Sequence, residues 1–159
     1  MKRNRTAVIG LGNYLLADEG AGMHAVEILR KKNYSGGVDF VDAGTPGMNL
    51  LHQFENRDRI IFIDSGECGL KPGKFARFRP EEVRSLKNSK NYSLHEFDLI
   101  SFLDKALETG AVDNADIIIY CMQAAEIKMS EELSPEVDRG LPEMIEVIFS
   151  EIEGENKNA

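Results

Sequence analysis

The chain has 159 residues, of which 42% are hydrophobic and 29% charged, and its 19 Lys+Arg against 27 Asp+Glu give a net charge of −8. This composition predicts one globular domain, and the acidic balance argues against binding to nucleic acid or to an anionic membrane, since both require basic surface. No apolar run reaches the roughly 18 residues of a membrane span, and Cys68 and Cys121 are expected to be free, buried thiols of a cytoplasmic protein.

Apolar strand patterns alternate with amphipathic helical patterns along the chain. In chain order we predict a strand at Thr6–Leu11, a helix from about Asp18 to Lys31, a strand at Val38–Asp42, a short helix over 47–55, a strand at Arg59–Asp64, an edge strand at Lys74–Arg79, a short helix from Pro80, a helix opened by a capping box at Ser93, a strand at Asp116–Met122 and a helix opened by Ser134. The pattern indicates an α/β sandwich with a mostly parallel sheet, formed by residues 1–153 and followed by a disordered tail, 154–159.

Polar and acidic residues gather directly after the predicted strands. The first strand is followed by Gly12, Asn13, Asp18 and Glu19, the second by the loop 42–47 and the last by Gln123, while Asp64 ends the third. In open α/β sheets, ligands bind outside the carboxyl ends of the strands. We therefore expect a functional site at this edge of the sheet.

The glycines after the first strand suggest a dinucleotide site, but the surrounding residues argue against one. The run Gly10-Leu-Gly12-Asn-Tyr-Leu lacks the third glycine of GxGxxG. Asp18 and Glu19 place negative charge at the helix start, where a phosphate would have to bind. We therefore predict that no nucleotide binds here.

The acids and the histidine near this edge also have ordinary structural interpretations. Asp18 is expected to be the N-cap of the first helix, and Glu19 a first-turn acid that interacts favourably with the helix dipole. Asp64 is harder to explain, because a carboxylate at the end of a buried strand needs a metal, a basic side chain or backbone N–H groups as its partner. His95 alone, near a helix start, is more often a surface residue than a ligand.

Taken together, Glu19, Asp64 and His95 predict a metal site. Each lies at a strand end or a helix start, so all three can converge on one edge of the sheet. Two carboxylates and one imidazole, with open positions for water or substrate, suit a borderline divalent metal such as Ni²⁺ or Zn²⁺. The sequence has no HExxH motif and no arrangement that argues for a Ser-His-Asp or Cys-His enzyme.

The motifs and their order resemble the hydrogenase maturation endopeptidases. The resemblance is carried by AVIGLGNYLLADEGAGMHAVEIL, VDAGTPGMNLL, IIFIDSG, SLHEFDLISFL and LSPEV, which run from about Ala7 to Ile148. It implies a three-layer α/β/α sandwich with a mostly parallel, twisted central sheet. It also implies that the family's metal-contacting residues fall on Glu19, Asp64 and His95.

The same resemblance implies an activity and a partner. Members of the family remove a C-terminal extension from the precursor of the [NiFe] hydrogenase large subunit once nickel has been inserted, so the nickel would come with the substrate. In one version the ligands share the nickel, which polarises the scissile carbonyl or activates a water. In another the nickel only positions the peptide, and Asp42 or Asp64 is the general base. Whether the free enzyme holds a divalent metal at the same site stays open.

The loop that follows the second strand would line the peptide groove, with Gly44, Thr45 and Gly47 in contact with the substrate. Two details depart from the family pattern. Ala43 stands where relatives have glycine, and Ala124 stands where relatives often have proline. Neither touches the expected ligands, so they leave open which hydrogenase is served.

Other functions remain possible from the sequence. Peptidyl-tRNA hydrolases also have a Gly-Leu-Gly-Asn strand end, but they continue with Pro-Gly where this chain has Tyr14, and they need a basic face. The chain could instead be a nickel-dependent checkpoint protein or chaperone that binds the large subunit without cutting it. It could also be a relative that processes another metalloprotein.

Overall fold

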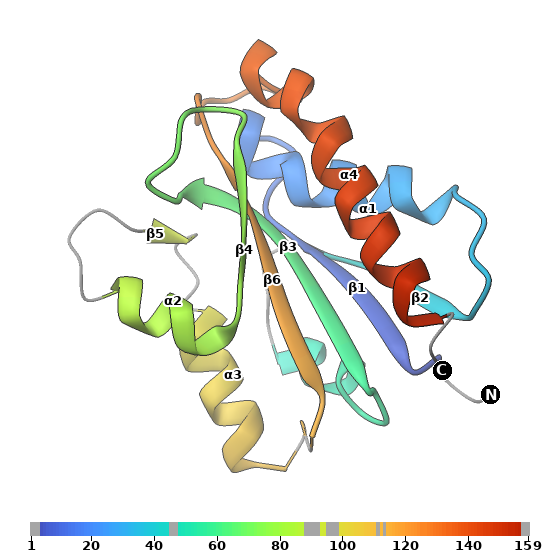
Figure 1. Cartoon of the computed structure of the whole chain (residues 1–159). Helices are drawn as coiled ribbons and strands as arrows, with labels where there is room; N and C mark the ends of the chain where they lie inside the picture. The colour runs from blue at the N-terminus through green and yellow to red at the C-terminus, as the bar shows by residue number, and fades with distance from the viewer. Residues whose placement is uncertain are drawn as a thin grey trace.

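The computed structural model describes residues 4–44, 48–87, 93–94, 99–110, 112 and 114–156. Its strands are β1 (Thr6–Leu11), β2 (Val38–Gly44), β3 (Arg59–Glu67), β4 (Phe75–Phe78), β5 (Ser93–Leu94) and β6 (Asp116–Gln123). Its helices are the 3₁₀ helices η1 (Ala17–Gly20) and η2 (Met48–Gln53) and the α-helices α1 (Ala21–Arg30), α2 (Pro80–Lys87), α3 (Leu99–Glu108) and α4 (Pro135–Asn156). The strand order is β2-β1-β3-β6-β4, with β5 paired to the end of β3 (Figure 1).

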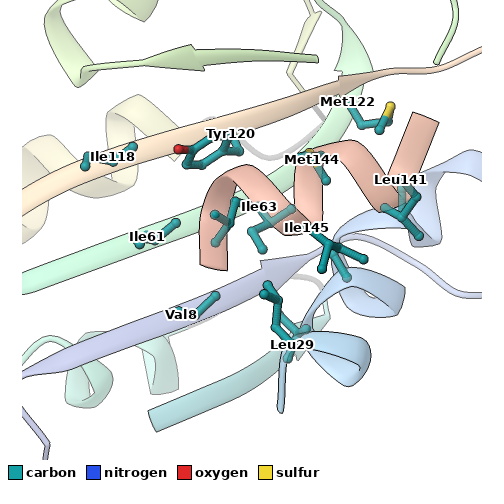
Figure 2. Close-up of a cluster of buried hydrophobic side chains, with 14 of the residues drawn as sticks. Val8, Leu29, Ile61, Ile63, Ile118, Tyr120, Met122, Leu141, Met144 and Ile145 are labelled. Atoms are coloured by element: carbon teal, nitrogen blue, oxygen red, sulfur yellow. The ribbon is translucent and has the colours of Figure 1, made fainter. Parts of the chain in front are cut away.

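The sheet is mostly parallel and is covered on both faces, as the sequence predicts. The pairs β1–β2, β1–β3 and β3–β6 are parallel, whereas β4 and β5 are antiparallel to their neighbours. Helices α1 and α4 pack on one face, and α2, α3 and η2 pack on the other. Figure 2 shows the cluster beneath α4, whose members include Ile61, Tyr120 and Ile145. The fold is therefore a three-layer α/β/α sandwich.

Several element boundaries differ from the sequence predictions. The helix expected from Asp18 begins as the 3₁₀ helix η1, and α1 starts only at Ala21. The strand expected to end at Asp64 continues to Glu67, because it pairs there with β6 and β5.

One further prediction is wrong. Ser93 does not open a helix through a capping box: it lies in β5, opposite Glu67. Helix α4 extends to Asn156, into the segment 154–159 that the sequence predicts as a tail; residues 157–159 lie outside the described part of the chain.

Cys68 and Cys121 form a disulfide, so the expectation of two free thiols is also wrong. Cys121 lies in β6, and Cys68 directly follows β3, so the strand pairing brings together two residues that are 53 positions apart. Both side chains are buried, at 0% and 1% exposure. The pairing removes the argument from free thiols on which the cytoplasmic prediction partly rested. Among the described helices, none is both long enough and apolar enough to cross a membrane.

Candidate functional site

The strand order reverses direction next to β1, and the candidate site lies at that point. From β1 the chain passes through α1 to β2 on one side, and it then returns past β1 to β3 on the other. The crevice of an open sheet forms where the order changes in this way, outside the carboxyl ends of the two strands. Helix α1 packs tightly against it, since a Cβ on Gly22 would lie 2.3 Å from the Ile63 carbonyl oxygen and 2.6 Å from that of Leu11.

The glycine turn after β1 fixes the backbone of Glu19. Gly12 has φ = +135°, and a Cβ there would lie 1.8 Å from the carbonyl oxygen of Glu19. The Asn13 N–H donates a hydrogen bond of 3.1 Å to the same oxygen. Only glycine permits this approach, so the turn locks an acid in place where a nucleotide-binding turn would hold a phosphate. The Glu19 side chain is only partly buried.

Asp18, the residue before Glu19, fixes the other part of η1. It is not the N-cap that the sequence predicts. It is fully buried, and its carboxylate accepts four hydrogen bonds of 2.8 Å, from the N–H groups of Ala125, Glu126 and Ser134 and from the Ser134 hydroxyl. Ser134 itself caps α4, because its hydroxyl also accepts from the Val137 N–H at 3.3 Å. Asp18 thus ties η1 to the segment between β6 and α4.

Asp64 lies on β3, between the residues of β3 that pair with β1 and those that pair with β5. The pairing of β1 with β3 reaches Ile63, and the pairing with β5 starts at Gly66. Alternation along β3 puts Ile60 and Phe62 on the α3 side of the sheet, so Asp64 also points to that side. Its carboxylate is 1% exposed and accepts a hydrogen bond of 2.8 Å from the N–H of Ser65.

The predicted third ligand, His95, lies outside the described residues. The residue before it, Leu94, pairs with Gly66, two positions along β3 from Asp64. Within the described segments no group of three or more His, Cys, Asp and Glu side chains is placed to hold a metal ion. The two predicted acid ligands, Glu19 and Asp64, therefore lie on η1 and β3 at the same edge of the sheet, and the structure leaves the histidine untested.

Asp42 lies apart from Asp64. It is exposed on the edge strand β2. Its side chain lies near Tyr14, because burial of the Tyr14 phenol and the charges of Asp42 and Glu27 together raise the pKa of that phenol. Because Tyr14 also packs edge-to-face on the ring of His24 in α1, at 5.0 Å, Asp42 lies toward the α1 side. Asp64 points to the opposite side of the sheet.

The loop predicted to line a peptide groove is described only in part. Gly44 has φ = +57°, no atom of the described residues lies within 4 Å of where its Cβ would be, and its carbonyl accepts from the Gly12 N–H at 3.0 Å. This bond places the end of β2 beside the glycine turn. Thr45 and Gly47 lie outside the described residues.

Sequence reasoning missed two residues that organise the edge. Asp18 binds partners that are 107 to 116 positions away, so no local pattern could reveal its role. Gln123 accepts from the N–H groups of Cys68 and Leu70 and donates to Glu67, which fixes the turn after β3. The sequence places it after the last strand, but only the strand register shows what it binds.

Comparison with known proteins places this arrangement in a family. Residues 23–151 match the HycI hydrogenase maturation protease family. Over 119 residues the chain is 35% identical to the hydrogenase expression/formation protein HupD of Bradyrhizobium diazoefficiens, a match that covers 74% of this chain and 62% of HupD. It is 31% identical over 159 residues to a Methanocaldococcus jannaschii protein named as a candidate hydrogenase maturation protease, with 96% and 99% of the two chains covered. The matched region is thus less than two thirds of HupD but nearly all of the archaeal protein.

Two solved structures have the same architecture. The [NiFe] hydrogenase maturation protease HybD from Thermococcus kodakarensis superposes with a TM-score of 0.80 at 29% identity, covering 93% of this chain and 99% of HybD. The hydrogenase maturating endopeptidase HybD from Escherichia coli gives a TM-score of 0.80 at 28% identity, with 95% and 93% covered. The fold expectation is therefore confirmed.

Proposed function

The chain belongs to the hydrogenase maturation protease family, and from this we propose that it is an endopeptidase that removes the C-terminal extension of a [NiFe] hydrogenase large-subunit precursor after nickel insertion. The observation that carries the proposal is the pair of acids at the reversal point of the sheet. Glu19 is held there by the glycine turn and by Asp18, and Asp64 lies on the neighbouring strand end. Such an edge is built to meet a cation.

The donor set suits nickel carried by the substrate. We propose that Glu19 and Asp64 contact it, with His95 as the third ligand, because Leu94 is paired beside the end of β3. Carboxylate and imidazole are ligands that borderline divalent metals accept. Nickel bound there supplies Lewis-acid chemistry, in that it polarises the scissile carbonyl or lowers the pKa of a water.

The protein's own contribution is to orient the peptide and to move a proton. Of the two candidate general bases we favour Asp64, because it points into the α3 side of the crevice from which β5 leads to His95. Asp42 lies on the α1 side beside Tyr14. The burial of Asp64 excludes bulk water, which strengthens its interaction with any cation or proton that reaches it.

The segment after β2 is proposed to hold the substrate tail. None of the described residues fills the space where a Cβ on Gly44 would be, and a glycine lets a peptide backbone approach closely. Thr45 and Gly47 would extend that surface. The bond from the Gly12 N–H to the Gly44 carbonyl connects the tail-binding segment to the turn that fixes Glu19.

The test is the intact mass of a purified large-subunit precursor before and after incubation with this protein. We expect the loss of one C-terminal peptide, and no loss with the Asp64→Asn variant. A stable complex without any change in mass would instead identify a checkpoint protein that binds and does not cut. If no precursor tested is cleaved and none forms a complex with this protein, the proposal is contradicted.

A further inference from the structure

Three large apolar side chains stand exposed next to the site, on two segments that are far apart in the sequence. Leu15 is 50% exposed, Ile127 57% and Met129 79%. Leu15 follows the glycine turn and precedes η1, whereas Ile127 and Met129 lie between β6 and α4. We call these three residues the apolar rim. Single exposed apolar residues are common, but several together in one place indicate an interaction surface.

Backbone hydrogen bonds join the two segments side by side. The Ser130 N–H donates to the Leu15 carbonyl at 3.0 Å, and the Ala17 N–H donates to the Ser130 carbonyl at 2.7 Å. The Asp18 N–H donates to the Glu126 carbonyl at 3.2 Å. Leu15 therefore lies directly beside the residue that follows Met129. Figure 1 shows the segment after β6 and the start of α1 at the same end of the sheet, at the top of the view.

Asp18 anchors the backbone on both sides of Ile127 and Met129. The buried carboxylate receives the N–H groups of Ala125 and Glu126, which directly precede Ile127, and also both donors of Ser134. A surface that is already ordered loses little conformational entropy when a partner binds. The same carboxylate holds η1, so the rim and Glu19 keep a fixed relation to each other.

The charges around the rim indicate what its partner carries. Lys128 is paired with Glu126 at 3.2 Å, so it adds no free positive charge. Glu131 and Glu132, both exposed, follow directly in the chain. An apolar patch with an acidic border is complementary to an apolar patch bordered by basic side chains.

We propose that the apolar rim is the docking surface for the folded body of the substrate protein, at the place where its C-terminal tail leaves that body. The inference rests on the proposed function, because it takes the tail into the site next to Glu19. The rim would supply most of the affinity, through an apolar contact on the substrate that is flanked by lysine or arginine. The acids at the sheet edge would then act on a tail that is already delivered.

The test measures affinity separately from cleavage. Binding of the nickel-loaded precursor is measured by biolayer interferometry for the Ile127→Ser/Met129→Ser double variant, and processing is followed by intact mass. The matched control is Ile28→Ser/Leu107→Ser, which removes two side chains of 44% and 52% exposure on α1 and α3, away from this edge. All binding measurements use an Asp64→Asn background, so that the tail stays attached.

We expect the rim variant to raise the dissociation constant at least roughly tenfold, as the loss of interface anchors does, and the control to change it less than about twofold. Equal dissociation constants for the rim variant and the control would overturn the proposal, whether or not the precursor is cut. The absence of any complex with the unaltered surface would also overturn it. A complex that depends on the rim but is never cleaved would support the docking surface and contradict the proposed endopeptidase activity.

Discussion

Carboxylates at the two ends of the central sheet have different kinds of interaction partner. At the amino ends of the strands, acids are paired with arginines: Asp58 with Arg5, Asp39 with Arg57, Glu151 with Arg59 and Asp116 with Arg79. At the carboxyl ends, Asp18 is held by backbone N–H groups and a hydroxyl, and Glu67 by the amide of Gln123. Neutral donors satisfy a carboxylate without cancelling its charge. The acids named at the amino ends are therefore neutralised by arginines, whereas Asp18 and Glu67 at the carboxyl ends are held by neutral donors.

The largest effect is expected from the acids of the carboxyl end. Glu19→Gln and Asp64→Asn keep the shape of each side chain and remove its charge, so we expect processing to fall by roughly a thousandfold or more while the fold is retained. Asp42→Asn is the matched control, since Asp42 is exposed on the α1 side. Intact mass measures the processing rate of each variant, and thermal melting followed by circular dichroism measures whether the fold is retained. A loss of processing in Asp42→Asn but not in Asp64→Asn would identify Asp42 as the general base.

The disulfide is the next largest contribution. A cross-link between residues 53 positions apart restricts the unfolded chain, so its reduction is expected to lower the free energy of unfolding by about 3–4 kcal/mol. Urea unfolding with and without dithiothreitol measures this, and Cys68→Ala is the control, whose stability the reductant should not change. Two free thiols found by reaction with Ellman's reagent in the oxidised, unfolded protein would contradict the pairing.

Two glycines near the same edge give a direct contrast. Gly12→Ala forces a Cβ to within 1.8 Å of the Glu19 carbonyl oxygen, whereas Gly44→Ala meets no atom of the described residues within 4 Å. The φ of Gly44, +57°, lies in the left-handed region, which costs alanine about 1 kcal/mol, whereas the φ of Gly12, +135°, is nearly exclusive to glycine. We expect Gly12→Ala to lose about 3 kcal/mol or more and Gly44→Ala only about 1 kcal/mol, both by urea unfolding. Equal losses would mean that the turn does not press on Glu19.

The smallest effect concerns the amino end and depends on pH. Burial alone would raise the pKa of Glu151, but hydrogen bonds from Arg77 and Tyr120 and the charges of Arg77 and Arg59 outweigh it and hold the pKa below its usual value. A carboxyl group with a lowered pKa stabilises the fold above its unfolded pKa, and the contribution is lost as the pH falls through the folded value.

Glu151→Gln is therefore expected to cost about 1–2 kcal/mol near neutral pH, and the difference from the unaltered protein should vanish in acid. Thermal melting across the pH range measures it. Processing at neutral pH should be unchanged, since Glu151 lies on α4 near the amino ends of the strands. A processing defect in this variant would contradict the division between the two ends.

The sequence predicts the elements well where local pattern decides them. β1 has the predicted bounds, and α4 begins after Ser134 as expected, because an apolar run and a cap are local signals. The first helix starts late because Ala17, at φ = +51°, turns the chain so that Asp18 points inward to partners more than 100 positions away. Ser93 pairs with β3 instead of capping a helix, since a free strand end competes for it.

For the candidate site, the sequence predicts which acids follow the strands but not what those acids contact. Acids after strands indicate a cation-binding edge, but their individual roles follow from strand register and long-range contacts. Asp18 and Glu19 are neighbours in the sequence, yet one is a fully buried clamp and the other a partly exposed acid. The cysteine pairing likewise depends on Cys121 lying in register with Asp64 on β3, next to the turn that carries Cys68.

The most direct measurement is the rate of tail release from nickel-loaded and nickel-free precursor, followed by intact mass with the unaltered protein and with Glu19→Gln. If the acids at the carboxyl end meet the substrate's nickel, the unaltered protein will cut only the loaded precursor, and Glu19→Gln will cut neither form at a comparable rate. Equal cleavage of the loaded and the nickel-free precursor would contradict this, and the acids would then need another purpose.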